Sequence, residues 1–260
     1  ELKADVDSNR TPNVIHIRGP AEIAKIHVSG QIVKRTLELL EEHILPGVET
    51  LELDRLAEEY IRSQGALPGF KGLYGYPATL CISIDDEVVH GIPGRRKLKE
   101  GEIVGVDVGA FKNNYFGYHA RTFPVGSISE EKQKLMDVTR QCLYVGIEQA
   151  KPGNRIGDIG NAIQKYAEKN GFSVVRELVG HGIGTNLHEE PQIPNFGKKN
   201  RGEVIEAGMC FAIEPMINMG KPDVKTLKDG WTVVTHDGHP SAHFEHTITI
   251  TENGPEILTN

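Results

Sequence analysis

IVGVDVGAFKNNYFGYHARTFPV, residues 103–125, predicts two β-strands joined by a tight hairpin turn at Asn113-Asn114. Asparagine tolerates the left-handed backbone that a two-residue hairpin turn requires. With this turn, Asp107 lies opposite Ala120 on the second strand, and Tyr118 is the diagonal neighbour of Asp107.

The alternation of side chains along a strand decides what Asp107 can contact. Asp107 and Tyr118 share one face of the hairpin, whereas His119 points to the other face. An unpaired buried carboxylate costs a great deal of free energy. The hairpin therefore predicts that Asp107 has a polar or ionic partner on its own face.

An internal repeat links this stretch to the second half of the chain. Residues 45–65, LPGVETLELDRLAEEYIRSQG, align without a gap to residues 151–171, KPGNRIGDIGNAIQKYAEKNG. The matched pairs, all at an offset of 106, are Pro46 with Pro152, Gly47 with Gly153, Leu53 with Ile159, Tyr60 with Tyr166, and Gly65 with Gly171. The pattern indicates a duplication in which each half contributes a similar helix.

The repeat continues into the strands. EGEIVGVDV (100–108) resembles EAGMCFAIEP (206–215), which aligns Asp107 with Glu214. YHARTFPV (118–125) resembles EHTITIT (245–251), which aligns Tyr118 with Glu245. The duplication thus predicts an acidic residue at position 118, where the chain has a phenol.

The remaining elements follow from periodicity and from Pro and Gly boundaries. Residues 1–19 are polar and predict an N-terminal arm, and residues 20–260, which no linker interrupts, predict a single domain. The expected helices are 21–44, 50–64 and 129–150. The expected strands lie near 79–90, 174–180, 231–235 and 244–250, and residues 191–202 are expected to form an exposed loop.

Composition excludes several classes of protein. A formal charge of −7 and a pI of about 5.9 give no support for nucleic-acid binding. Three cysteines without CxxC spacing favour reduced thiols and a cytoplasmic location. No apolar run approaches the roughly 20 residues of a membrane span.

Three carboxylates, Asp107, Glu214 and Glu245, stand inside apolar strand runs where isolated charges do not belong. Carboxylates with an imidazole are the ligand set expected for Mn, Fe(II), Co or Zn. The alternative is a buried ion-pair or hydrogen-bond network, although no Lys or Arg adjoins these residues in sequence. Glu189 and Glu190 are expected to be surface charges.

Seven motifs occur in a fixed order from about residue 20 to the C-terminus: HGIP, VDVG, GHGIG, LHEEP, AIEPM, DGWTVVT and HFEHT. In order and spacing the chain resembles the type I methionine aminopeptidase family of dinuclear metallohydrolases. The resemblance implies an α+β pita-bread fold, in which two pseudo-symmetric αβ halves surround a central curved antiparallel sheet.

The resemblance also implies the roles of individual residues. The implied metal ligands are Asp107, His181, Glu214 and Glu245. The implied catalytic residues are His90, which contacts substrate near the new N-terminus, His188, which donates a hydrogen bond to the scissile carbonyl, and Glu214, which handles a proton. The implied methionine pocket consists of Phe70, Tyr76, Leu187 and Trp231, with Leu73 at a position where the family usually has Tyr.

Tyr118 is the main departure from the family pattern, because it stands where an Asp is expected to bridge two metal ions. One metal site keeps His181, Glu214 and Glu245, whereas the other keeps only Asp107 and Glu245. We therefore expect up to two divalent ions, with weakened occupancy of the second site.

The expected activity is removal of the initiator methionine from peptides and nascent chains. The ribosome is an expected partner, neither nucleic acid nor membrane is bound directly, and the protein is expected to be a monomer. The alternative is a catalytically inactive relative that acts as a binding module, which Tyr118 motivates. A prolidase or creatinase-like hydrolase is a weaker alternative, because those proteins usually add a large N-terminal domain for which residues 1–19 leave no space.

Overall fold

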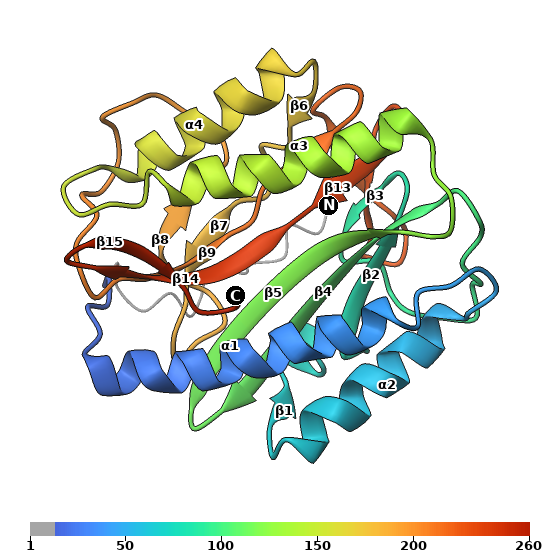
Figure 1. The fold of residues 1–260 in the computed structure, drawn as a ribbon, viewed down its shortest axis with the longest axis horizontal. Coiled ribbons are helices and arrows are strands. Elements are labelled where there is room, and N and C mark those ends of the chain that lie inside the picture. Colours follow the sequence, from blue (N-terminus) through green and yellow to red (C-terminus); the bar gives the residue numbers. More distant parts are fainter. Residues whose placement is uncertain (1–13) are drawn as a thin grey trace.

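A computed structural model describes residues 14–260 and contains two pairs of helices that pack against a long antiparallel sheet (Figure 1). The first pair is α1 (Pro20–Glu41) and α2 (Thr50–Ser63), and the second is α3 (Glu130–Ile147) and α4 (Ile156–Lys169). Pro20 occupies the first turn of α1, where its missing N–H costs nothing. Residues 1–13 of the predicted N-terminal arm lie outside the described residues.

The long sheet runs across both halves of the chain in the order β1-β4-β5-β14-β9-β7-β8, with β2 also paired to β4 and β15 to β14. Its strands are β1 (Leu67–Pro68), β2 (Leu80–Ile84), β4 (Ile103–Lys112), β5 (Tyr115–Pro124), β7 (Gly180–Gly182), β8 (Glu189–Ile193), β9 (Cys210–Ile213), β14 (Glu245–Thr251) and β15 (Gly254–Ile257).

Two three-stranded sheets complete the described part of the fold, in the orders β13-β10-β6 and β11-β12-β3. Their strands are β3 (Glu87–Val89), β6 (Ser173–Val174), β10 (Met216–Asn218), β11 (Val224–Thr226), β12 (Val233–Thr235) and β13 (Ser241–His243). A short 3₁₀ turn, η1 (Leu73–Gly75), lies between β1 and β2.

The predicted hairpin is confirmed. Asn113 and Asn114 have φ angles of 54° and 65°, and Asp107 pairs with Ala120. His119 points away from Asp107 and stacks on His246, with ring centroids 4.6 Å apart. The turn chemistry therefore set the register of the two central strands as expected.

The predicted duplication is confirmed in the helices. Both the first and the last residues of α2 and α4 differ by 106 positions, the offset of the sequence repeat. The glycines that follow the two helices, Gly65 and Gly171, both have positive φ, at 66° and 85°. A left-handed residue after the last turn is the usual way to end a helix, and glycine adopts it at the lowest cost.

Each half has its own apolar core between its helices and the sheet. In the first half, residues such as Leu37, Leu53 and Val106 are fully buried. In the second half, Leu143 and Ile248 are among the corresponding residues. Because the sheet is continuous and the helices of each pair share one core, the expected α+β architecture of two similar halves is confirmed.

Two local predictions were wrong. The strand expected near 174–180 is divided into β6 and β7, and the residues between them are not in a strand. The loop expected to be exposed from residue 191 begins inside β8, where Pro191 and Ile193 are buried because β8 pairs with β7. Short strands of this kind carry too few alternating residues to be recognised.

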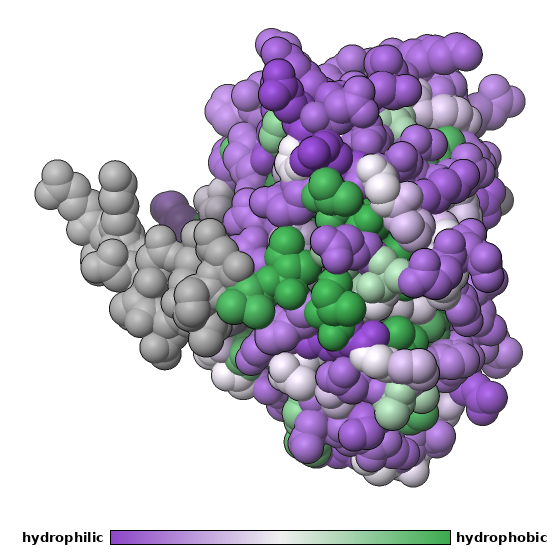
Figure 2. Space-filling view, turned by 90° about the vertical axis from the view of Figure 1, so that its left-hand side faces the viewer, coloured by the Kyte–Doolittle hydropathy of each residue, from purple (hydrophilic) through white to green (hydrophobic). Residues whose placement is uncertain are grey.

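The described surface is mostly hydrophilic, with apolar side chains gathered in a small area on the face in Figure 2. Tyr74, with 72% of its surface exposed, is the most exposed of the large apolar side chains. Within residues 14–260, no helix is both long enough and apolar enough to cross a membrane.

Candidate metal centre and substrate pocket

A cavity of about 280 Å³ lies where strands of the two halves meet. All ten residues to which sequence analysis gave a role line this cavity, as does Tyr118. The lining residues are Phe70, Leu73, Tyr74, Tyr76, Cys81, His90, Asp107, Tyr118, His181, Leu187, His188, Glu214, Trp231 and Glu245. The structure thus brings the predicted site residues together, and their roles remain predictions.

Cross-strand registers place the acidic side chains in one row. Asp107 pairs with Ala120 across β4 and β5, and Ala120 pairs with Glu245 across β5 and β14. His246 pairs with Ile213, the residue before Glu214, so the row continues from Glu245 toward Glu214. Adjacent strands lie about 4.8 Å apart. The fold therefore sets three carboxylates side by side on one face of the sheet.

A second row on the same face, two residues further along the strands, carries Tyr118 and His181. Tyr118 pairs with Gly109 in the hairpin, and His181 pairs with Ala212 of β9. Thr247 joins them, because it pairs with Ala212 and its hydroxyl bonds to the backbone of Tyr118. Only Thr247 and Ala212 lie between Tyr118 and His181 in this row, and the ring centroids of Tyr118 and His181 are 6.0 Å apart.

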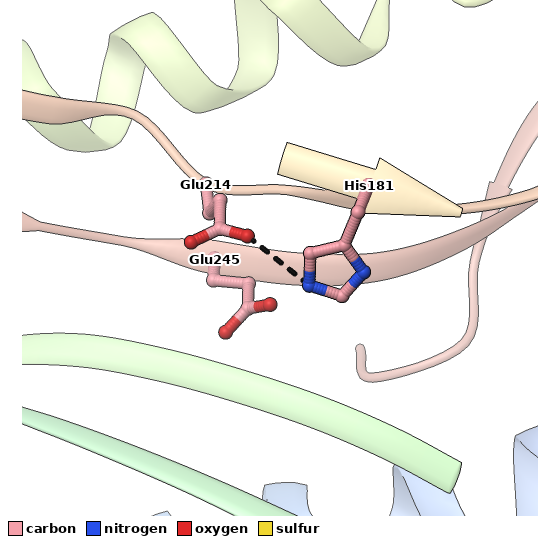
Figure 3. A group of neighbouring side chains, drawn as sticks. All are labelled: His181, Glu214 and Glu245. Atoms are coloured by element: carbon pink, nitrogen blue, oxygen red, sulfur yellow. Dashed lines mark ion pairs between the residues drawn. The ribbon is translucent and has the colours of Figure 1, made fainter. Parts of the chain in front are cut away.

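His181, Glu214 and Glu245 form the donor group shown in Figure 3. Each offers one ligand atom, and these atoms all lie within 4.8 Å of one another. His181 Nε2 is 3.4 Å from Glu214 Oε1, while His181 Nδ1 donates to the carbonyl of Gly182 at 2.9 Å. The Nδ1 bond leaves the Nε2 lone pair facing the carboxylates, as in many metal-binding histidines.

The pKa shifts of these residues favour binding of a cation, because negative charge on the carboxylates is unfavourable unless a positive charge lies nearby. Burial lowers the pKa of His181 to about 4, so this imidazole is neutral near pH 7. Burial raises the pKa of Asp107 to about 7, and burial and the neighbouring Asp107 raise the pKa of Glu214 and of Glu245.

The ion-pair alternative finds no cation in the described part of the chain. Glu214 lies 3.4 Å from His181 Nε2 and 3.8 Å from His243 Nε2, and both imidazoles are neutral near pH 7, because burial lowers the pKa of His181 to about 4 and that of His243 to about 3. No Lys or Arg among residues 14–260 forms a salt bridge with Asp107 or Glu245. Three carboxylates without a cationic side chain, Glu245 buried and Asp107 and Glu214 half-buried, are suited to a divalent metal ion.

Tyr118 fills the space beside this donor group. Only 2% of its surface is exposed, and its hydroxyl has no hydrogen-bond partner in the described structure. Its ring stacks on Phe70, with centroids 5.5 Å apart and planes inclined by 14°. Gly109 makes room for the ring, since a Cβ at Gly109 would lie 2.5 Å from Tyr118 Cε1. The phenol ring is therefore closely packed between Phe70 and the Gly109 backbone.

The remaining wall of the cavity is apolar and aromatic. Tyr76 and Trp231 meet edge to face, with centroids 5.0 Å apart. The Tyr76 hydroxyl lies 2.9 Å from the carbonyl oxygen of Leu80 and 3.0 Å from that of Gly91, which fixes the ring. Such a wall suits the polarisable thioether of methionine.

Two histidines provide polar groups at this wall. His188 meets His181 edge to face, with ring centroids 4.4 Å apart. His90 has a φ of 62°, a conformation that is uncommon for a residue with a side chain. Strained backbone of this kind is frequent at ligand-binding sites, where the surrounding structure maintains it.

Sequence analysis missed three features of the site. His243 lies near Glu214, and its position two residues before Glu245 in HFEHT could have signalled it. Cys81 faces the cavity because it pairs with Asp107, which the alternation along β2 could have indicated. The expectation for Glu189 was wrong, because its side chain is 4% exposed and forms an ion pair with Arg18.

Comparison with known proteins gives matches along nearly the whole chain. A profile of metallopeptidase family M24 matches residues 24–252. The methionine aminopeptidase of Clostridium perfringens is 54% identical over 246 residues, covering 95% of this chain and 99% of that protein. Methionine aminopeptidase 1 of Bacillus subtilis is 52% identical over 246 residues, with the same coverages. The crystal structure of methionine aminopeptidase from Rickettsia prowazekii matches with a TM-score of 0.94 at 41% identity, covering 95% of this chain and 100% of that chain.

The curved sheet, the donor group and these matches together define a metallopeptidase with the pita-bread fold. More particularly, the chain belongs to metallopeptidase family M24 and, within it, to the methionine aminopeptidases. The fold and the family inferred from the ordered motifs are therefore confirmed.

Proposed function

We propose that this protein is a methionyl aminopeptidase, which uses a divalent metal ion to hydrolyse the bond after an N-terminal methionine. The observation that carries the proposal is the donor group of His181, Glu214 and Glu245 at one wall of an apolar cavity. A methionine side chain in that cavity would bring its own amide bond close to the donors. Residues 20–260 would act as one catalytic domain, because the cavity needs both halves.

The chemistry of the donors fits a bound divalent ion such as Co, Mn, Fe(II) or Zn. His181 Nε2 and carboxylate oxygens of Glu214 and Glu245 would hold it. A bound ion polarises the scissile carbonyl and lowers the pKa of a coordinated water. Asp107, separated from Glu245 in the row by the small Ala120, would add negative charge at the edge of the site.

The chain's own residues would perform the other steps. Glu214 would accept a proton from the attacking water and pass it to the leaving amine, which balances the hydrolysis. His188 would donate a hydrogen bond to the carbonyl oxygen as negative charge develops on it. His90 would contact the substrate near the new N-terminus.

Binding of the methionine side chain would use the apolar wall. Phe70, Tyr76, Leu187 and Trp231 would enclose the thioether. Leu73, which also lines the cavity, would make this wall less polar than a tyrosine there. A charged first residue should therefore bind poorly, because the wall offers no partner for its charge.

Tyr118 leads us to propose one well-held metal ion rather than two. The oxygens left for a second ion are those of Asp107, Glu245 and the phenol. Asp107 Oδ1 and the Tyr118 hydroxyl are both buried without hydrogen-bond partners in the described structure, so the region is polar but poorly supplied with charged ligands. A neutral phenol is a much weaker ligand for a hard cation than a carboxylate.

The physiological setting is part of the proposal. The substrates would be nascent proteins as they leave the ribosome, and the protein would act as a monomer in the cytoplasm. Three buried cysteines without disulfides, Cys81, Cys142 and Cys210, are consistent with a reducing compartment.

Hydrolysis of a Met-Ala-Ser peptide tests the function directly. Metal-free protein is assayed after addition of Mn, Co, Fe(II) or Zn, and free methionine is measured. We expect turnover with at least one metal, none with a chelator, and little on the control peptide Glu-Ala-Ser. The Glu214→Gln variant serves as the inactive control. If folded protein releases no methionine with any metal, the proposal is wrong and the inactive binding module is favoured.

A further inference from the structure

We propose that Arg18 and Glu189 are positioning residues that hold the turn at residues 184–189, and thereby His188, at the substrate. This inference rests on the proposed function, since it concerns the histidine expected to contact the scissile carbonyl. Arg18 and Glu189 are 171 positions apart in sequence, and neither lines the cavity.

The two side chains form a buried ion pair. Arg18 Nη2 donates to both oxygens of Glu189, at 2.9 Å and 2.7 Å, and each side chain is 4% exposed. The Arg18 backbone is itself fixed, because its N–H donates to the carbonyl of Gly208 at 2.8 Å. Arg18 is thus anchored to the chain that leads into β9, and its charge is directed at the base of the turn.

Glu189 also organises the turn that precedes it. Its Oε1 accepts hydrogen bonds from the backbone N–H of Asn186 at 3.0 Å and from the Thr185 hydroxyl at 3.3 Å. One carboxylate therefore closes the loop over residues 185–189, with His188 next to it in the chain. If the carboxylate moved, the turn that carries His188 would lose both its backbone bond at Asn186 and its side-chain bond at Thr185.

Gly184 shows how closely Arg18 is packed against this turn. A Cβ on Gly184 would overlap the Arg18 guanidinium, so a side chain there would displace Arg18 from this position. The Gly184 carbonyl accepts a hydrogen bond from the N–H of Phe116 on β5 at 2.8 Å. The turn is accordingly held at one end by the central hairpin and at the other by Arg18.

The turn presents Leu187 and His188 to the cavity. Leu187 is 8% exposed and lies in the apolar wall, while the His188 ring lies edge to face with His181. A buried ion pair is a poor source of net stability, because desolvation offsets much of the attraction. Its value here is a defined geometry, since small displacements of a catalytic group lower the rate steeply.

Steady-state kinetics with Met-Ala-Ser test the pair. We expect Arg18→Met and Glu189→Gln each to lower kcat by about 10–100-fold, with KM changed by less than about 3-fold. Arg18→Lys should recover part of the loss. The matched control is Arg121→Met, which breaks an ion pair with Glu41 on the helix side of the sheet and should leave kcat unchanged. Thermal unfolding confirms that each variant is folded at the assay temperature.

A double-mutant cycle separates positioning from general damage. If Arg18 acts through His188, then Arg18→Met should cause little further loss of kcat in a His188→Ala background. An undiminished loss in that background would overturn the proposal, as would an unchanged kcat in folded Arg18→Met. If single variants do not fold, Arg18→Gln combined with Glu189→Gln removes both charges and is measured instead.

Nuclear magnetic resonance of ¹⁵N-histidine in the full chain, without added metal, gives a readout that does not need turnover. His188 signals are assigned with His188→Ala. Arg18→Met should shift or broaden the His188 signals and leave those of the exposed His236 unchanged. Unaltered His188 signals would contradict the positioning role. Absence of turnover in the wild type would instead contradict the proposed function, and the two failures are thus distinguishable.

Discussion

Two strand pairs meet at the centre of the long sheet, β4–β5 from the first half and β9–β14 from the second. They have similar backbones, each with a carboxylate after an apolar run, but they carry different side chains at the site. The second half, with His181, supplies all three members of the donor group, whereas the first half supplies Asp107 and the packed ring of Tyr118. A duplicated backbone therefore does not guarantee duplicated chemistry.

The largest effect should come from a second-half ligand. Glu214→Gln keeps the shape of the side chain but removes its charge. We expect turnover of Met-Ala-Ser to fall by more than about 100-fold and metal affinity to fall with it. Asp107→Asn, the matched change in the first half, should lower turnover less. Equal losses in the two variants, measured as kcat/KM at saturating metal, would show that both halves supply the metal centre equally.

The packing of Tyr118 can be tested at Gly109. Gly109→Ala places a methyl group against the Tyr118 and Phe70 rings, so we expect a loss of about 1–3 kcal/mol in the free energy of unfolding. Urea denaturation measures it. In a Tyr118→Asp background the loss should shrink, because one of the two rings is gone. The same loss in both backgrounds would mean that the Tyr118 ring does not pack against Gly109.

Metal binding should depend on pH because the metal displaces protons. In the metal-free protein burial raises the pKa of Asp107 to about 7 from an ordinary value of 3.8. This raised pKa stabilises the metal-free fold at low pH, and the contribution is lost as pH rises through about 7. Displacement of the Asp107 proton alone should therefore make metal affinity about 10-fold higher at pH 8 than at pH 6. Titration calorimetry at the two pH values measures this, and a constant affinity would contradict it.

The smallest expected effect concerns the two helices of the duplication. Gly65→Ala and Gly171→Ala each force a side chain into the left-handed region after α2 or α4. Neither site has a backbone atom close to the new Cβ, so the cost should be that of the backbone alone, about 1 kcal/mol each. Similar losses in the free energy of unfolding, measured by urea denaturation, would support equivalent ends for α2 and α4. A large difference between the two losses would argue against equivalent ends.

The sequence predicted much of the fold because the decisive signals were local. The Asn113-Asn114 turn fixed the register that sets Asp107 against Ala120, and the Pro-Gly repeat fixed the bounds of α2 and α4. The ordered motifs contain eight of the ten candidate site residues, and the resemblance that they carry implied the other two, Phe70 and Tyr76; all ten line one cavity. These signals involve residues close in the chain or repeated at one offset.

What the sequence did not reveal depends on contacts between distant segments. The ion pair of Arg18 with Glu189 has no local pattern, so Glu189 looked like a surface charge. The repeat aligned Tyr118 with Glu245 as equivalent positions, but it did not show which residues face each other across the strands. In the structure Glu245 pairs with Ala120, two residues along β5 from Tyr118. The register between β5 and β14 depends on how strands from the two halves pair, which a repeat in the sequence does not specify.

Metal stoichiometry tests the contrast between the halves most directly. Purified wild type and Tyr118→Asp are titrated with Mn or Co by calorimetry, and bound metal is counted by mass spectrometry, with Tyr118→Phe as the matched control. We predict one tightly bound ion in the wild type and in Tyr118→Phe, and two in Tyr118→Asp. Two ions of similar affinity in the wild type, with nothing gained in Tyr118→Asp, would contradict the account.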